Sequence, residues 1–246
     1  MKTLAAPAFT IQVAKDRAFF DHGWLKTYHS FSFADYYDPK NENWGALRVF
    51  NDDTVAGGAG FPTHPHRDME IVTYVLSGKL AHKDSIGSEG IVGPGGVQFM
   101  SAGTGVRHSE YNANPDEPLH FVQMWVIPGT TGEPPTYGQM DFTPEERTNT
   151  WLRVVSGDPA VEAPIRITQD ATLAVSRVED ATVVYEFGPQ RYGFCFVADG
   201  KVEANGETLH RGDAVRLYDV PRLAVKGHGE LVLWDTVGLD ESTRLG

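Results

Sequence analysis

The sequence predicts an all-β protein, built as a β-sandwich or as β-barrels, that contains few short helices. Apolar runs of strand length, such as residues 71–76 and 119–127, recur along the 246 residues. Glycine-rich turns separate these runs, and Asn205-Gly206 is a dipeptide typical of a tight hairpin. A chain of this length forms one large domain or two small ones. Closing each sheet into a barrel leaves no exposed edge strand, which favours barrels over open sheets.

The N-terminal half contains the clearest strand signals. Residues 8–50 hold short runs rich in aromatic residues, most of which we interpret as core. The apolar run 71–76 ends at a Ser-Gly pair and indicates a hairpin, while residues 97–100 form a further strand. Residues 119–127 alternate imperfectly, which is typical of a strand buried on both faces. We therefore expect an N-terminal barrel over residues 1–130.

The C-terminal half follows a change in composition. Residues 131–150 are predicted to be a linker, because glycine, proline and threonine are frequent around them. Within this segment, Thr143 and Glu146 form a capping-box pattern with Pro144 at the first helical position, so we expect a short helix there. Strand-like runs separated by turns resume afterwards. They predict a second barrel over residues 151–246.

Composition excludes several classes of function. The chain has 21 basic and 33 acidic residues and a formal net charge of −12, which argues against a direct nucleic-acid surface. No apolar run approaches the ~18 residues of a membrane helix, so we expect no membrane partner. Pro7 and Thr10 interrupt an opening that slightly imitates a signal peptide, and we interpret it as mature chain. The single Cys195 cannot form an internal disulfide, and these observations together predict a cytoplasmic location.

Two short segments carry pairs of metal-binding side chains. His64 and His66 are two residues apart, and so are His108 and Glu110. In a β-strand, side chains at positions i and i+2 leave the same face, roughly 6–7 Å apart at their roots. Two such pairs on facing strands can converge on one ion, with three neutral imidazoles, one carboxylate and room left for water or substrate. A lone His-x-His pair often arises by chance, but two pairs beside glycine-rich turns predict a metal site.

The same segments resemble a known family. Each has the spacing of a cupin motif, with glycine first and polar ligand residues after it. The residues are Gly58, His64, His66 and Glu70 in the first segment, and Gly105, His108 and Asn112 in the second. A longer spacer after Glu70, a glycine in place of proline at Gly103 and a displaced glycine at Gly96 depart from the general form. With flanking segments such as residues 23–37 and 101–110, these departures resemble the pirin family.

This resemblance has implications for the fold and the metal. It implies two cupin (jelly-roll) β-barrels packed together, a bicupin, with one divalent transition metal per chain. The resemblance supports His64, His66, His108 and Glu110 as ligands and implies Fe(II) as the commonest occupant. The ligand types alone equally admit Mn, Co, Ni, Cu or Zn. No paired ligand spacing occurs after residue 150, so the C-terminal barrel is expected to lack a metal site.

Two glutamates compete for the fourth ligand position. A general cupin comparison favours Glu70, whereas the pirin resemblance favours Glu110. Parity also favours Glu110, because a residue two positions from His108 shares its face of a regular strand. We therefore predict that Glu110 is both a ligand and the catalytic base. We assign Glu70 to the surrounding shell, where a carboxylate can orient a ligand histidine through its free N–H.

The resemblance also implies an activity. Bacterial proteins of this layout are similar to quercetin 2,3-dioxygenases, which implies a small aromatic substrate and O2 as partners. Such an enzyme would bind the 3-hydroxyl and 4-carbonyl of a flavonol, open its heterocycle with O2 to a depside, and release carbon monoxide. The substrate could equally be a related enolic compound. The alternative is a non-enzymatic metal-binding regulator that binds a transcription factor, and the acidic charge is compatible with such a protein partner.

Overall fold

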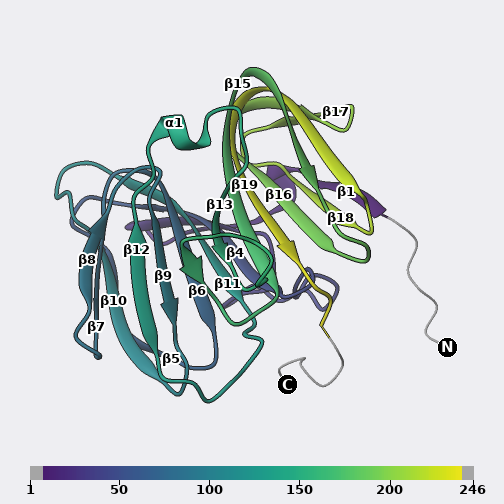
Figure 1. The fold of residues 1–246 in the computed structure, drawn as a ribbon. Coiled ribbons are helices and arrows are strands. Elements are labelled where there is room, and N and C mark those ends of the chain that lie inside the picture. The colour runs from purple at the N-terminus through teal and green to yellow at the C-terminus, as the bar shows by residue number, and fades with distance from the viewer. Residues whose placement is uncertain (1–7, 240–246) are drawn as a thin grey trace.

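The computed structural model describes residues 8–239, and it is an all-β bicupin in which two barrels pack together (Figure 1). The N-terminal barrel, drawn in blue and teal, lies beside a C-terminal barrel drawn in green and yellow. The fold class expected from the sequence is confirmed. Among the residues described, no helix combines the length and the apolar character that a membrane crossing requires.

Among residues 8–239, eleven strands in two sheets form the N-terminal barrel. They are β2 (Ala18–Asp21), β3 (Leu25–His29), β4 (Leu47–Val55), β5 (Gly60–His66), β6 (Glu70–Ser77), β7 (Leu80–Asp84), β8 (Glu89–Val92), β9 (Val97–Ser101), β10 (Val106–Asn112), β11 (Leu119–Val126) and β12 (Thr136–Met140). The large sheet has the order β12-β9-β6-β11-β4-β3-β2, and the small sheet has the order β5-β10-β7-β8. Their facing sides enclose the interior of the barrel.

The large sheet is buried on both faces. In β6, the six consecutive residues 70–75 are all buried, and β11 is almost as fully covered. One face lines the interior of the N-terminal barrel, and the other packs against the C-terminal barrel. The absence of polar alternation over residues 119–127 therefore has the physical cause that the sequence predicted.

In the described part of the chain, eight strands form the sheet of the C-terminal barrel. They are β1 (Ala8–Gln12), β13 (Leu152–Ser156), β14 (Ile165–Arg166), β15 (Ala171–Glu186), β16 (Tyr192–Ala204), β17 (Glu207–His210), β18 (Ala214–Tyr218) and β19 (Arg222–Thr236). Their order is β1-β18-β16-β19-β15-β13-β14, with β17 paired to β16. The three long strands β15, β16 and β19 lie side by side and supply most of its apolar interior.

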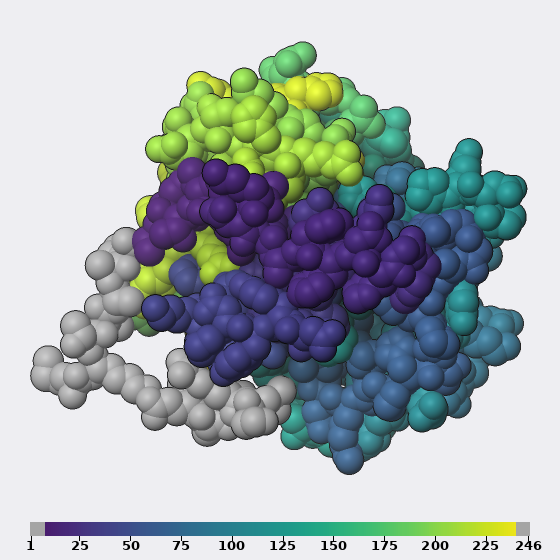
Figure 2. Space-filling view, turned by 180° about the vertical axis from the view of Figure 1, so that it is seen from behind, coloured from purple at the N-terminus to yellow at the C-terminus, as the bar shows by residue number. Residues whose placement is uncertain are grey.

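The first strand corrects the predicted domain assignment. The expected N-terminal barrel includes residues 8–12, but β1 pairs with β18 of the C-terminal barrel. After β1, the short 3-10 helix η1 (Ala14–Asp16) begins with the Ala14 N–H donating to the carboxylate of Asp213 at 2.8 Å. The N-terminal segment then runs across the surface between the two barrels, as the purple band in Figure 2 shows. This pairing uses backbone groups of an edge strand, which no local sequence pattern specifies.

The predicted linker contains both the expected helix and an unexpected strand. The helix α1 (Pro144–Arg147) has the predicted capping box, in which Thr143 Oγ1 accepts from the Glu146 N–H at 3.4 Å. The Glu146 carboxylate accepts from the Thr143 N–H at 2.7 Å. Strand β12 lies in the same segment but pairs with β9 in the N-terminal barrel. Most of its side chains face solvent at a sheet edge, so it lacks the apolar alternation by which strands are recognised.

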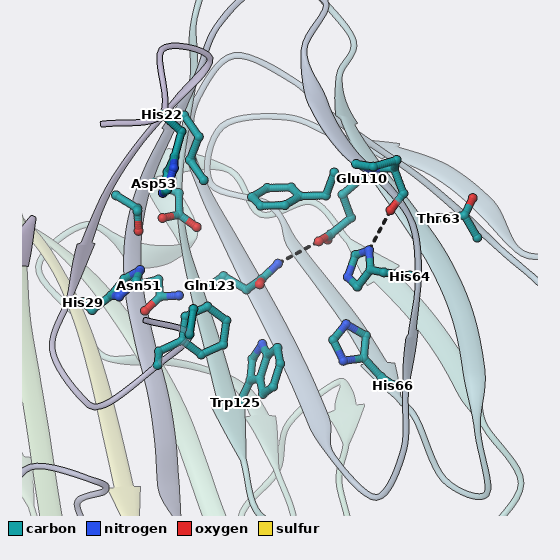
Figure 3. Close-up of a pocket in the computed structure, with 16 residues that line it drawn as sticks. His22, His29, Asn51, Asp53, Thr63, His64, His66, Glu110, Gln123 and Trp125 are labelled. Carbon is teal, nitrogen blue, oxygen red and sulfur yellow. Dashed lines mark hydrogen bonds between the residues drawn. The ribbon is translucent and has the colours of Figure 1, made fainter. Parts of the chain in front are cut away.

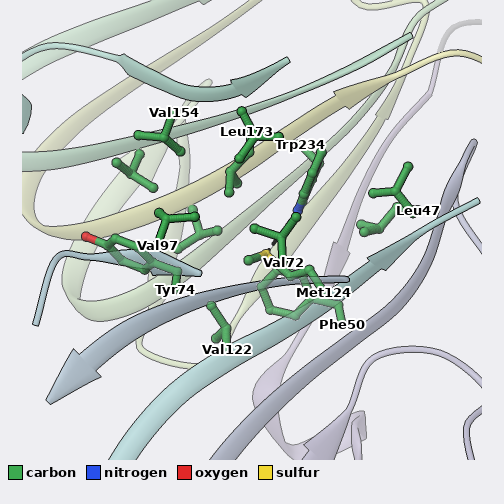
Figure 4. Close-up of a cluster of buried hydrophobic side chains, with 14 of the residues drawn as sticks. Leu47, Phe50, Val72, Tyr74, Val97, Val122, Met124, Val154, Leu173 and Trp234 are labelled. Atoms are coloured by element: carbon green, nitrogen blue, oxygen red, sulfur yellow. Dashed lines mark hydrogen bonds between the residues drawn. The ribbon is translucent and has the colours of Figure 1, made fainter. Parts of the chain in front are cut away.

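The two barrels share one hydrophobic core. Figure 4 shows Phe50, Val72 and Met124 of the large N-terminal sheet packed towards Leu173 and Trp234 of the C-terminal sheet. The Trp234 indole N–H points at the Met124 sulfur, with a nitrogen–sulfur distance of 3.0 Å. All five side chains have zero exposure. Since burial of this apolar surface needs both halves, each barrel stabilises the other.

Candidate metal centre

The two histidine-bearing strands are neighbours within one sheet. β5 and β10 pair antiparallel, with His108 opposite His64 and Val106 opposite His66. The two predicted pairs of metal-binding side chains therefore lie on neighbouring strands of one sheet. The register of the pair shifts between His108 and Glu110. Glu110 is nevertheless buried on the inner face of the small sheet, as its parity with His108 predicts.

Three histidines form a tight cluster. One ring nitrogen from each of His64, His66 and His108 lies within 4.8 Å of the others. The Nε2 atoms of His64 and His108 are 3.1 Å apart. Two nitrogens that are each about 2.1 Å from one ion lie about 3 Å apart when their bonds to it are nearly perpendicular. The cluster therefore fits a transition-metal ion through its donor types and through this nitrogen–nitrogen distance.

The surroundings keep these imidazoles uncharged. Burial, with the neighbouring His108 and His64, lowers the pKa of His66 to about 4. Burial, with His64 and His82, lowers the pKa of His108 to about 3. Both rings are therefore neutral at pH 7, and the neutral imidazole is the form that donates a nitrogen lone pair to a metal.

Glu110 lies beside the histidines in a separate network of hydrogen bonds. The Gln98 side-chain amide donates to Glu110 Oε1 and the Gln123 amide donates to Oε2, each at 2.7 Å. A carboxylate oxygen of Glu110 also lies within 4.8 Å of ring nitrogens of His82 and His108. His108 thus belongs to two overlapping groups of donors. The four residues expected as ligands occupy one region of the barrel interior, with Glu110 oriented by two amides.

The two glutamines were missed by the sequence analysis. They belong to a polar row that crosses the inner face of the large sheet, where cross-strand partners follow one another through five strands. The row consists of His29, Asn51, Gln123, Thr73 and Gln98. The sequence does contain a signal for these two residues, because each glutamine interrupts an otherwise apolar strand. A polar residue at a buried strand position needs a partner, which suggests a role in a site.

Glu70 does not have the role that the sequence predicted. Its Oε1 atom accepts from the backbone N–H and the hydroxyl of Thr168, at 2.6 and 2.9 Å, and its Oε2 atom accepts from the Gln169 N–H at 3.4 Å. These hydrogen bonds join β6 to the C-terminal barrel. The expectation that Glu70 orients a ligand histidine is therefore wrong. On β6, the Glu70 side chain lies on the face of the sheet that packs against the C-terminal barrel, not on the face that lines the N-terminal barrel.

His82 is the residue that lies behind a candidate ligand. Its Nδ1 atom is 3.5 Å from Nδ1 of His108, on the side of that ring remote from His64. Its Nε2 atom is 3.1 Å from Oδ2 of Asp84, and its ring stacks on Tyr137 with centroids 4.3 Å apart. Asp84 and Tyr137 thus hold the His82 ring, which in turn limits the orientation of His108. The i, i+2 spacing of His82 and Asp84 could have indicated this pair from the sequence.

This arrangement predicts different effects for two substitutions. His82→Phe keeps a ring against Tyr137 but removes the nitrogen beside His108, and it should weaken metal binding by about 10–100-fold. Glu70→Gln should leave metal affinity unchanged, because Glu70 contacts Thr168 and Gln169. Competition against a chromophoric chelator measures both affinities, with circular dichroism as the check on folding. Equal losses in the two variants would contradict the assignment of His82.

The cluster opens onto a cavity of about 400 Å³. In Figure 3, His64, His66 and Glu110 stand on one wall and His22, His29, Asn51 and Asp53 on the opposite wall. Figure 3 places Trp125 between the two polar walls. The lining also includes the apolar and aromatic side chains of Leu25, Phe33 and Phe61. The volume and the lining are those of a pocket for a small, largely flat molecule.

Comparison with known proteins covers both barrels. Residues 11–126 match the family model described as Pirin, and residues 153–233 match the model described as Quercetinase C-terminal cupin domain. A protein of Caulobacter vibrioides named Pirin-like protein is 44% identical over 219 residues, which span 87% of this chain and 94% of that protein. A protein of Escherichia coli K12 named Quercetin 2,3-dioxygenase is 38% identical over 228 residues, which span 92% of this chain and 97% of that protein.

Two solved structures also match this chain over nearly its whole length. The crystal structure of YhhW from Escherichia coli is 37% identical and superposes with a TM-score of 0.88, covering 95% of this chain and all 100% of that one. A second structure of that bacterial pirin, in complex with nickel(II), has a TM-score of 0.87 at 37% identity and covers 94% of this chain and 100% of its own. The arrangement of the two barrels is therefore shared with these proteins along nearly their whole length.

Proposed function

The chain belongs to the pirin family, and on that premise we propose that it is a metal-dependent dioxygenase that cleaves a flavonol or a related enolic compound with O2. One observation carries the proposal: His64, His66 and Glu110 face a cavity with aromatic walls that is about 400 Å³ in volume. A purely structural metal would not need a cavity beside it. The relative named Quercetin 2,3-dioxygenase supports the reaction class.

We assign His64, His66, His108 and Glu110 as the residues that hold one divalent metal per chain. Iron(II) is the proposed occupant, and the nickel(II) complex of YhhW supports a site for a divalent transition metal in this fold. The bound ion would supply Lewis acidity, which lowers the pKa of the substrate hydroxyl, and redox chemistry towards O2. Replacement of iron by a neighbouring divalent metal is compatible with the same donor set.

Glu110 acts as the general base in this proposal. Its Oε2 atom takes the proton of the flavonol 3-hydroxyl. Glu110 and Gln123 both line the cavity, and Gln123 donates to Oε2, so this is the oxygen on the cavity side. Gln98 holds Oε1, so the carboxylate cannot rotate away between turnovers. The bound metal would lower the pKa of the enolic hydroxyl, so a carboxylate is a strong enough base to take its proton.

The aromatic walls position the substrate and exclude water. Phe33 and Trp125 contact each other edge to face, with ring centroids 5.3 Å apart, and Trp125 contacts His66 in the same way at 4.9 Å. They form one side of a slot beside the candidate ligands. A deprotonated flavonol held there reacts with O2, both oxygen atoms enter the depside, and the lost ring carbon leaves as carbon monoxide. The slot keeps solvent protons from the anion during this reaction.

The proposed reaction is tested with the purified, iron-loaded protein. A flavonol should be consumed under air, with carbon monoxide formed in equal amount, and not under argon or after chelation of the metal. A flavone that carries the same hydroxyl groups except the 3-hydroxyl should be a poor substrate, since it has no proton for Glu110 to remove. Equal turnover of the two compounds, or no turnover of any flavonol at full metal occupancy, would overturn the proposal.

A further inference from the structure

The wall opposite the histidine cluster contains hydrogen-bond acceptors without partners. Asn51 and Asp53 lie two residues apart on β4, so both side chains point into the barrel. Each residue is only 3% exposed. Within residues 8–239, the Oδ1 atom of each is buried and accepts no hydrogen bond. A buried acceptor without a partner destabilises the folded state unless a ligand or an ordered water supplies a donor.

The neighbours of these two residues do not satisfy either acceptor. Thr27, opposite Asp53 on β3, is near enough to lower the pKa of that carboxyl, but among the described residues its hydroxyl has no hydrogen-bond partner. Across the sheet, Asn51 is flanked by His29 and Gln123, and the Gln123 amide donates to Glu110 instead. In the part of the chain that the structure describes, the Nδ1 atom of His29 is itself buried without a partner. Burial together with Arg17 lowers the pKa of His29 to about 4, so the ring is neutral. Several polar atoms therefore face the same end of the cavity unpaired. Figure 3 shows this group at the far side from His64 and His66.

We propose that Asn51 and Asp53 form a distal subsite that accepts hydrogen bonds from hydroxyl groups on the end of the substrate remote from the metal centre. This inference rests on the proposed function and narrows its substrate class to aromatic compounds that are hydroxylated at both ends. A chelating hydroxyl and carbonyl occupy the histidine wall, the rings lie between Phe33, Phe61 and Trp125, and a phenolic hydroxyl pair reaches β4. The subsite determines specificity and takes no part in bond breaking.

The chemistry of the wall favours this class over others. Carboxylate and amide oxygens accept from a hydroxyl, whereas a methyl ether offers no proton and a carboxylate group would be repelled by Asp53. Burial, with Asp52 and Glu110 nearby, raises the pKa of Asp53 to about 7. A hydroxyl that donates to Asp53 stabilises its ionised carboxylate and so offsets the free-energy cost of burying that charge. The distal wall therefore selects neutral donors.

The test compares two flavonols on the Fe(II)-loaded protein under argon, where binding is measured without turnover. One carries a 3′,4′-dihydroxyphenyl ring, and the other carries an unsubstituted phenyl ring. Quenching of tryptophan fluorescence should give a dissociation constant at least about 10-fold lower for the dihydroxy compound, since each lost hydrogen bond costs about that factor. In Asp53→Leu, the preference for the dihydroxy compound should shrink by about 10-fold, the effect of one lost hydrogen bond. Asn51→Leu makes the same comparison if Asp53→Leu does not fold.

Thr54→Val is the matched control. It changes β4 on the face opposite Asn51 and Asp53, outside the cavity, and should keep the preference for the dihydroxy compound. If wild type binds both flavonols equally, or if metal-loaded Asp53→Leu and Asn51→Leu keep the preference, the subsite is wrong even where turnover under air supports the dioxygenase. If the preference is present and depends on Asp53 but no flavonol is consumed under air, the subsite stands and the proposed reaction fails.

Discussion

Replacing His64 and His66 together with alanine should give a folded protein that binds no transition metal and has no measurable turnover. Both side chains come from β5 at the edge of the small sheet and are only half-buried, so their removal disturbs little packing. It removes two of the three imidazoles in the cluster, and His108 with Glu110 alone cannot hold an ion firmly. Metal per chain, measured by plasma mass spectrometry after loading and desalting, should fall from about one to zero.

A matched double variant distinguishes this loss from a general effect of removing histidines. His210 and His228 are both exposed on the C-terminal barrel, and their joint replacement by alanine should leave one metal per chain. Thermal melting of both double variants without metal should stay close to that of the wild-type apoprotein. Metal content that survives in His64→Ala, His66→Ala would mean that the site lies elsewhere in the chain.

Replacing Glu110 with glutamine should separate metal binding from catalysis. The three histidines remain, so the variant should retain some metal, while turnover of a flavonol falls by about 10²–10⁴-fold because an amide cannot take the hydroxyl proton. The shape of the side chain is preserved. In the variant, the new amide N–H₂ group would face the N–H₂ group of Gln98. Gln98 can turn its side-chain amide and accept that hydrogen bond through Oε1, which has no other partner among the described residues.

The decisive readout is the turnover rate per bound metal, measured at saturating substrate. Gln123→Glu, which replaces a donor to Glu110 with an acceptor, provides a companion variant. Repulsion between the two carboxyl groups should shift the acid limb of the pH–rate profile to higher pH. Wild-type turnover per metal in Glu110→Gln would show that another group accepts the proton.

Much of the candidate site follows from local sequence. The pairs His64/His66 and His108/Glu110 share a face of a strand because side chains alternate along any extended backbone, whatever the rest of the fold does. The same reasoning predicts the all-β class from short apolar runs and turn dipeptides. It also predicts the capping box of α1, in which the interacting residues Thr143 and Glu146 are three positions apart.

Tertiary structure alone decided which residues surround those pairs. Glu70 and His82 are both plausible partners for a ligand histidine by residue type, but strand register sends Glu70 to Thr168 and places His82 beside His108. Register depends on pairings between strands far apart in the chain, and a shift by one residue exchanges the two faces of a strand.

The same limit applies to the rest of the cavity and to the ends of the sheets. The polar row that brings Gln98 and Gln123 to Glu110 is continuous only across strands, not along the chain. β1 and β12 join sheets through backbone hydrogen bonds, which are available to almost any sequence. Local alternation therefore determined which side chains can act together on one strand. The register of distant strands decided what each of them contacts.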